Sequence, residues 1–128
     1  MALILVVDDD AETRVLLDEA LVREEGHEVR YADDGDSAID RLAHIKPDVV
    51  ITDIAMPRLN GIQLIRHLEN IRCGARVIAI SGKGRDGLQR AVDAGAMIAL
   101  EKPVEKRDLL DALDRALDLP DPWRWGRR

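Results

Sequence analysis

Three consecutive carboxylates, Asp8, Asp9 and Asp10, follow directly after an apolar run near the start of the chain. Like charges this close repel one another and raise one another's pKa unless a positive charge lies among them. Clustered carboxylates are natural ligands for a hard divalent cation such as Mg²⁺, which prefers oxygen and keeps several waters. The segment therefore indicates a metal site. A set of helix N-caps is the alternative, because aspartate is common at the position before a helix.

Three more polar residues follow later apolar runs of the sequence, namely Asp53, Ser81 and Lys102. A carboxylate, a hydroxyl and an ammonium around Mg²⁺ would suit a phosphoryl group, because phosphoryl transfer depends mainly on positioning and charge neutralisation. In such a site Asp53 would be the nucleophile that forms an acyl phosphate. Taken one at a time, Ser81 is typical of a turn and Lys102 of a solvated surface.

Alternating strands and helices must bring these residues together. Short apolar runs, often β-branched, predict buried strands at Leu3–Val7, Glu28–Ala32, Val49–Thr52, Val77–Ser81 and Met97–Glu101. Between and after them, apolar residues recur three or four positions apart, which indicates amphipathic helices. The (βα)5 order predicts an α/β fold with a doubly wound parallel sheet. Sites in such sheets form outside the carboxyl ends of the strands, so the polar residues above converge on one crevice.

Composition limits the class of protein. With 128 residues, 46% of them hydrophobic, the chain is long enough for one domain with a single core. The net charge of -6 argues against nucleic-acid and anionic-membrane binding, because such proteins usually present a basic face. The single Cys73 excludes an internal disulfide, and the apolar start is too short for a signal peptide or a membrane span. These features predict a cytoplasmic protein.

The motifs "VVDDDAETR", "DVVITDIAMPRLNG", "VIAISG", "DAGA" and "EKP" resemble the receiver domain of two-component response regulators. The resemblance runs from about Leu3 to Leu117 and implies a five-stranded sheet of flavodoxin-like order 2-1-3-4-5. It predicts a receiver domain over residues 1–119, with no output domain after it. Residues 120–128 differ in composition, holding both Trp, and are expected to form a flexible tail.

The resemblance also implies a Mg²⁺ site. The expected ligands are Asp8, Asp9, Asp53 and the backbone carbonyl of Ala55. Within the acid pair, Asp9 is favoured as the direct ligand, whereas Asp10 is expected to help cap the first helix.

The remaining roles concern the phosphoryl group. By this resemblance Asp53 is the phospho-acceptor, Ser81 is the switch hydroxyl that follows the phosphoryl group, and Lys102 pairs with a phosphoryl oxygen. A cis peptide is expected before Pro103. The sequence departs from the family at Ala99, where receivers usually carry an aromatic residue that moves with the switch hydroxyl.

A stand-alone receiver is the function favoured by these features. It would take a phosphoryl group from a phosphohistidine on a sensor histidine kinase or histidine phosphotransfer protein, then bind an unidentified downstream protein differently. We expect a monomer or weak dimer that catalyses only its own phosphorylation and dephosphorylation. Two alternatives remain. One is a phosphorylation-independent adaptor. The other is a phosphohydrolase of the haloacid dehalogenase type, whose D-x-D-x-[TV] pattern fits Asp8 and Asp10 but fails at Glu12.

Overall fold

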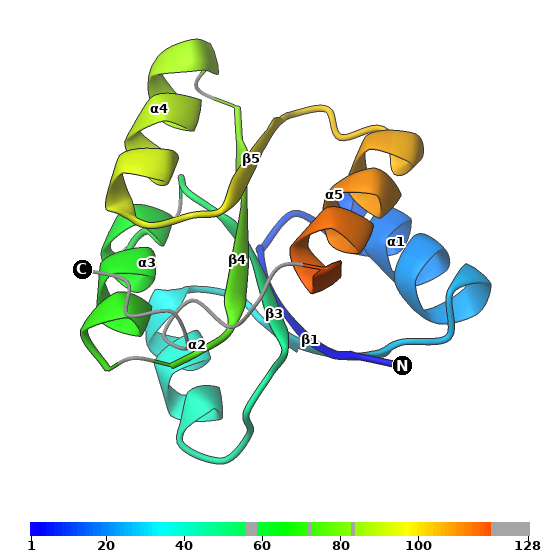
Figure 1. The fold of residues 1–128 in the computed structure, drawn as a ribbon, viewed down its shortest axis with the longest axis horizontal. Helices are drawn as coiled ribbons and strands as arrows, with labels where there is room; N and C mark the ends of the chain where they lie inside the picture. The colour runs from blue at the N-terminus through cyan, green and yellow to red at the C-terminus, as the bar shows by residue number, and fades with distance from the viewer. Residues whose placement is uncertain (56–58, 72, 83, 119–128) are drawn as a thin grey trace.

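Strands and helices alternate along the whole described chain (Figure 1). The computed structural model describes residues 1–55, 59–71, 73–82 and 84–118, so the predicted tail and the Met56-Pro57 part of the motif "DVVITDIAMPRLNG" lie outside it. The strands are β1 (Leu3–Val7), β2 (Glu28–Ala32), β3 (Val49–Asp53), β4 (Arg76–Ser81) and β5 (Ile98–Glu101). The helices are α1 (Ala11–Leu17), η1 (Asp18–Glu24), α2 (Gly35–Leu42), α3 (Gly61–Asn70), α4 (Gly84–Ala94) and α5 (Lys106–Asp118).

The five strands form one parallel sheet in the order β2-β1-β3-β4-β5, which confirms the predicted fold. Strand order reverses around β1, because β2 lies on one side of it and β3 on the other. The register aligns the carboxyl ends, with Val7 opposite Thr52 and Ser81 opposite Glu101. The residues that follow β1, β3 and β5 therefore meet at one edge of the sheet.

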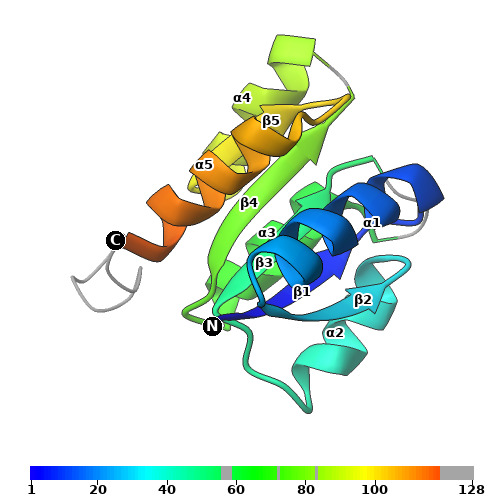
Figure 2. The same cartoon turned by 90° about the vertical axis from the view of Figure 1, so that its right-hand side faces the viewer.

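Helices cover both faces of the sheet, as Figures 1 and 2 show. α1, η1 and α5 pack on one face, where Leu21 and Leu113 meet the strand residues Ile4 and Ile51. α2, α3 and α4 pack on the other face, where Leu64 belongs to the second core cluster. Because both faces of the sheet are buried, the sequences of the central strands are mostly apolar throughout and do not alternate between apolar and polar residues.

The first helical segment differs from the regular helix that the apolar spacing predicts. α1 continues directly into η1, a stretch of wider π-helical turns, before the chain leaves the helix at Gly26 with a φ of 72°. Leu17, Ala20 and Leu21 are buried along this segment, so its apolar stripe remains on the core side. At its end, Glu24 pairs with Lys106, which joins η1 to the start of α5.

α3 begins immediately against the backbone at the end of β3. Asn60 caps the helix, and its side chain and that of Gln63 form a reciprocal capping box. A Cβ atom added at Gly61 would lie 2.2 Å from the carbonyl oxygen of Asp53 and 2.4 Å from the Cα of Ile54. Gly61 is thus the place where α3 touches the strand that ends in Asp53.

A Gly61→Ala variant is therefore expected to lower the free energy of unfolding by about 2 kcal/mol or more, because backbone atoms must move to admit a methyl group. Chemical denaturation measures this loss. Gly82→Ala is the matched control, since no heavy atom lies within 4 Å of a Cβ added there. Equal stabilities of the two variants would contradict the close contact at Gly61.

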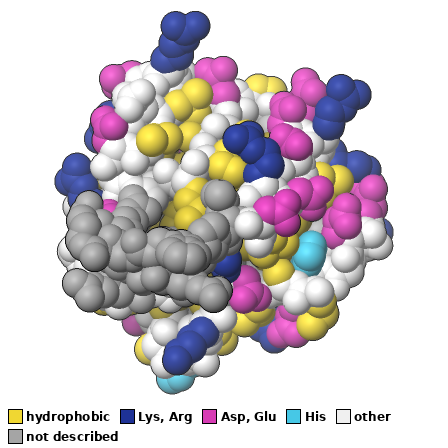
Figure 3. Space-filling model, viewed as in Figure 1, with side chains coloured by type: hydrophobic (Ala, Val, Ile, Leu, Met, Phe, Trp, Pro, Cys, Tyr) yellow, Lys and Arg dark blue, Asp and Glu magenta, His cyan; other side chains and the backbone are white. Residues whose placement is uncertain are grey.

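The described surface adds two observations about partners. No described helix combines the length and apolar character needed to cross a membrane. On the face shown in Figure 3, acidic side chains lie among the basic ones, and the basic side chains in the described part of the chain form no continuous patch. The described residues on this face therefore do not form the basic surface typical of nucleic-acid-binding proteins.

Candidate functional site

The segment after β1 places its three aspartates in different surroundings. Asp8 is buried, with 1% of its surface exposed, and its Oδ1 accepts a hydrogen bond from the Asp10 N–H at 2.8 Å. Asp9 is exposed. Asp10 caps α1, because its side chain accepts hydrogen bonds from the Glu12 N–H at 3.1 Å and the Thr13 hydroxyl at 2.8 Å. The helix-cap interpretation is confirmed for Asp10, whereas Asp8 points into the sheet edge.

Asp53, the last residue of β3, lies beside this acid pair. It is 6% exposed, and its Oδ1 accepts a hydrogen bond from the Ala55 N–H at 3.0 Å. One carboxylate oxygen each from Asp8, Asp9 and Asp53 lie within 4.8 Å of one another. Such a group of oxygens from two buried carboxylates and one exposed carboxylate fits the ligand preference of Mg²⁺.

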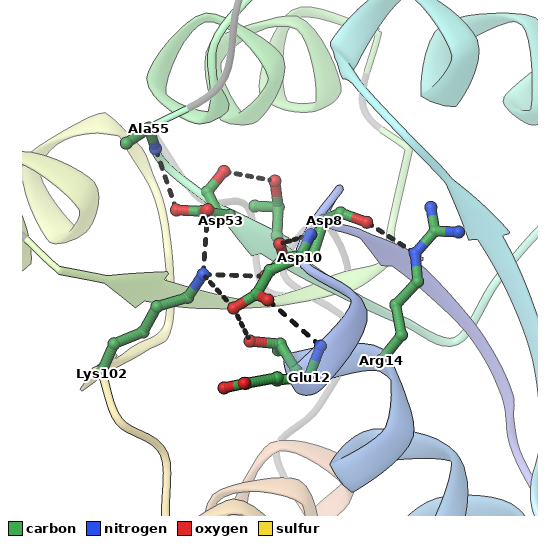
Figure 4. Close-up of polar contacts among 9 residues, drawn as sticks. Asp8, Asp10, Glu12, Arg14, Asp53, Ala55 and Lys102 are labelled. Carbon is green, nitrogen blue, oxygen red and sulfur yellow. Dashed lines mark hydrogen bonds and ion pairs between the residues drawn. The ribbon is translucent and has the colours of Figure 1, made fainter.

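Lys102 supplies the positive charge among these carboxylates (Figure 4). Its Nζ lies 3.1 Å from Asp53 Oδ2, 3.2 Å from Asp8 Oδ2 and 3.9 Å from Asp10 Oδ2. The contact of Lys102 with Asp53 is a hydrogen bond. The contact of Lys102 with Asp8 is an ion pair, because the buried Asp8 Oδ2 has no aligned hydrogen-bond partner in the described chain. One ammonium thus faces several carboxylates, and a divalent cation would bring the site closer to neutrality.

The protonation equilibria reflect this imbalance. Burial raises the pKa of Asp8 above its ordinary value of 3.8, although the Asp10 N–H and the charge of Lys102 oppose the rise. Burial acts to lower the pKa of Lys102, but its hydrogen bond to Asp53 and the negative charges of Asp8 and Asp53 outweigh burial, and the net pKa is raised. The Thr13 hydroxyl bond lowers the pKa of Asp10. The ammonium therefore stays charged, while the desolvation cost of the Asp8 carboxylate is only partly offset by its neighbours.

Ser81 and Lys102 are brought together through the backbone of the outer strands. Ser81 ends β4 and is fully buried, and its carbonyl accepts a hydrogen bond from the Lys102 N–H at 2.8 Å. The Lys102-Pro103 peptide bond is cis, as the resemblance implies. Four of the predicted side chains thus gather at one edge of the sheet, namely Asp8, Asp9, Asp53 and Lys102, and Ser81 adjoins Lys102 there through its backbone.

Two further predictions concern the neighbours of this group. Ala55 follows β3 and is exposed, and its N–H contacts Asp53, while the role of its carbonyl as a metal ligand stays a prediction. Ala99 lies on β5, partly buried against the core on the α2, α3 and α4 side. Tyr31 lies on β2 at the opposite edge of the sheet, so this tyrosine does not replace the missing aromatic.

Sequence reasoning missed Arg14, which donates a hydrogen bond from Nε to the carbonyl oxygen of Asp8 at 2.7 Å. Arg14 ends the motif "VVDDDAETR", but a basic residue one turn into an amphipathic helix is usually a solvated residue. The contact depends on the orientation of α1 relative to the sheet, and a local sequence pattern does not indicate that orientation.

The fold and the site define a class of protein. The sheet is flavodoxin-like, with an acid cluster after β1 and β3 and a lysine after β5. This arrangement is typical of a signalling domain whose site lies at the carboxyl edge of its sheet. The chain belongs to the response regulator receiver domain family, whose model matches residues 4–114.

Several known proteins are similar to this chain. The transcriptional regulatory protein PdtaR of Mycobacterium tuberculosis (strain H37Rv) is 40% identical over 115 residues, covering 89% of this chain and 56% of PdtaR. The chain thus spans about half the length of that relative. The chemotaxis protein CheY of Bacillus subtilis is 32% identical over 116 residues, covering 90% of this chain and 97% of CheY.

Solved structures agree with this membership. A putative response regulator from Chloroflexus aurantiacus matches with a TM-score of 0.86 and 26% identity, covering 92% of this chain and 98% of its own. The receiver domain of NtrX from Brucella abortus matches with a TM-score of 0.83 and 36% identity, covering 90% and 98%.

Proposed function

We propose that this receiver domain accepts a phosphoryl group on Asp53 in a Mg²⁺-dependent reaction and signals by changing which proteins it binds. The observation that supports this best is the position of the Lys102 ammonium, 3.1 Å from Asp53 and 3.2 Å from Asp8. It places one fixed cation beside the nucleophile and beside the acid pair that would hold the metal. Charge neutralisation of this kind is the main requirement of phosphoryl transfer.

The chemistry follows from the described side chains. A carboxylate oxygen of Asp53 attacks the phosphorus of a phosphohistidine, the new O–P bond forms as the N–P bond breaks, and the released imidazole nitrogen takes up a proton. Lys102 holds a phosphoryl oxygen, and Ser81 is the hydroxyl that follows the group. The carboxylates of Asp8, Asp9 and Asp53 and the Ala55 carbonyl would hold Mg²⁺, which would supply charge neutralisation to phosphoryl oxygens when bound.

A groove beside Lys102 offers a surface to the phosphoryl donor. It has a volume of about 390 Å³ and lies between α1 and the segment after β5. Its lining residues are Asp10, Glu12, Thr13, Leu16, Lys102, Pro103 and Val104. The apolar members provide area for a protein partner next to the reacting group. We propose a sensor histidine kinase or a histidine phosphotransfer protein as donor, and an unidentified protein as target of the phosphorylated form.

The same proposal covers the organisation of the chain. The receiver domain occupies residues 1–119, with residues 120–128 as a tail, and it acts in the cytoplasm as a monomer or weak dimer. Analytical ultracentrifugation with and without a phosphoryl mimic tests the oligomeric state.

Intact mass after incubation with acetyl phosphate tests the central proposal. We expect a gain of one phosphoryl group per chain with Mg²⁺ and no gain in excess EDTA. A single stoichiometric gain supports a receiver, whereas repeated release of phosphate from a generic ester would indicate the phosphohydrolase. No gain in a sample that demonstrably binds Mg²⁺ and is offered a phosphorylated histidine donor would contradict the proposal.

Ala99 favours one second candidate, a receiver-like adaptor that works without phosphorylation. The aromatic that usually couples the switch hydroxyl to the partner face is absent at this position, and Ala99 packs partly buried in β5. Amide chemical shifts with and without beryllofluoride distinguish the two. Shifts that reach α4 and β5 support a phosphorylation switch, and shifts restricted to the residues around Asp53 support the adaptor.

A further inference from the structure

Arg14 joins three groups around the loop that carries the acid pair. Its Nε donates to the carbonyl oxygen of Asp8 at 2.7 Å, and its Nη2 donates to Asp33 Oδ1 at 2.5 Å. Its guanidinium also lies over the ring of Tyr31, 5.3 Å from the ring centroid. The side chain is 30% exposed, so most of it is shielded from solvent. A planar group with donors in a fixed arrangement can satisfy all three contacts at once.

The contact with Asp8 acts on the backbone of the metal loop. Two other hydrogen bonds already fix this loop. Asp8 Oδ1 accepts one from the Asp10 N–H, and the Asp8 N–H donates the other to the Ala32 carbonyl at 3.1 Å. Arg14 adds a bond to the carbonyl of the peptide that leads into Asp9 (Figure 4). Both ends of the short Asp8 to Asp10 segment are therefore tied.

Asp9 depends on this arrangement more than the other carboxylates do. Within the part of the chain that the structure describes, no hydrogen bond or ion pair holds its exposed side chain. Its carboxylate oxygen nevertheless lies within 4.8 Å of those of Asp8 and Asp53. Among the described residues, the backbone that carries Asp9 is therefore what determines where its Cα–Cβ bond starts and which rotamers bring its carboxylate near Asp8 and Asp53.

We propose that Arg14 is a positioning residue of the Mg²⁺ site, which fixes the Asp8 carbonyl and so keeps the Asp9 carboxylate directed toward Asp8 and Asp53. This inference rests on the proposed Mg²⁺-dependent function. Arg14 does not touch the metal or the phosphoryl group. Its effect is comparable to that of residues that orient metal ligands in other proteins, whose loss commonly weakens metal binding by about 10- to 100-fold.

The sign of the effect separates positioning from simple electrostatics. If only charge mattered, removing a positive charge close to an acid cluster would increase the affinity of that cluster for a divalent cation. Positioning by Arg14 requires the opposite result, since the loss of the bond to the Asp8 carbonyl frees the loop. The two explanations therefore predict opposite changes in the Mg²⁺ dissociation constant.

Calorimetric titration of Mg²⁺ into the purified chain measures this constant. We expect Arg14→Ala to raise it about tenfold. Arg14→Met is the second variant, because it keeps an apolar stem against Tyr31 while removing both donors. Arg23→Ala is the matched control: it removes the same charge from an exposed position on η1 and should leave the constant unchanged or slightly lower.

Acetyl phosphate labelling at varied Mg²⁺ gives a second readout. The Mg²⁺ concentration for half-maximal rate should rise with the dissociation constant, while the rate at saturating Mg²⁺ stays near that of the unaltered chain. Mg²⁺ binding that is unchanged or tighter in both Arg14 variants would overturn the inference. Absence of Mg²⁺ binding by the unaltered chain would instead overturn the proposed function, so the two failures are distinguishable.

Discussion

An Asp53→Asn variant is expected to lose the phosphoryl gain, with the labelled fraction at least about 100-fold lower than in the unaltered chain. The amide lacks the anionic oxygen that attacks phosphorus. The fold should persist, because the amide oxygen can still accept the Ala55 N–H that bonds Asp53 Oδ1 at 3.0 Å. Intact mass after incubation with Mg²⁺ and acetyl phosphate measures the effect.

The matched control for this change is Asp48→Asn at the opposite end of β3. Asp48 is exposed and its Oδ2 accepts the Leu3 N–H at 2.9 Å, so the substitution removes the same charge far from the site. We expect this control to be labelled normally. Equal labelling of the Asp53 variant and the control would show that another carboxylate accepts the phosphoryl group.

Asp8→Asn is expected to have two effects of opposite sign. Mg²⁺ affinity should fall by roughly 2 to 3 kcal/mol, about a hundredfold, because a full charge next to a divalent ion is lost. In EDTA, however, the variant should be more stable than the unaltered chain by about 1 kcal/mol, since burial of this carboxylate raises its pKa and therefore opposes folding in the charged form. Thermal unfolding with and without Mg²⁺ measures both.

The pH dependence of that stability difference gives a check on its cause. The folded chain binds a proton at Asp8 more readily than the unfolded chain does, because the folded pKa lies above 3.8. As pH falls through the folded pKa toward 3.8, the unaltered chain gains stability relative to Asp8→Asn. The advantage of the variant in EDTA should thus be greatest near neutral pH and shrink on acidification. A difference that does not change with pH would assign the stabilisation to another cause.

Most of the sheet could be predicted because its strands are buried on both sides. Val49 to Asp53, for example, forms a fully buried strand that the sequence shows as a run of β-branched residues, three of them apolar and the last a threonine, followed by an acid. Predicted strand ends differ from the structure by one residue at β3, β4 and β5. The gathering of Asp8, Asp53 and Lys102 followed from topology alone, since carboxyl ends of parallel strands share an edge.

Other features depend on tertiary geometry that local patterns do not encode. The wide turns of η1 keep Ala20 and Leu21 buried just as a regular helix would, so apolar spacing does not reveal these turns. The Arg14 contact requires the helix that Asp10 caps to leave the sheet at an angle that brings Arg14 back over the Asp8 carbonyl. The spacing of apolar residues therefore predicted where this segment lies but not which loop it contacts.

The surroundings of Tyr31 have a practical consequence. It is the only tyrosine of the chain, its hydroxyl donates to Asp18 Oδ1 at 2.8 Å, and burial followed by that bond raises its pKa to about 12. The ring stays uncharged across ordinary buffers and lies under the guanidinium of Arg14. Isotope labelling of tyrosine would thus give signals from a single residue, whose chemical shifts respond to the charge of the guanidinium beside the ring. The native chain contains an intrinsic spectroscopic reporter of its acid loop, and ion binding can be followed there without an added dye.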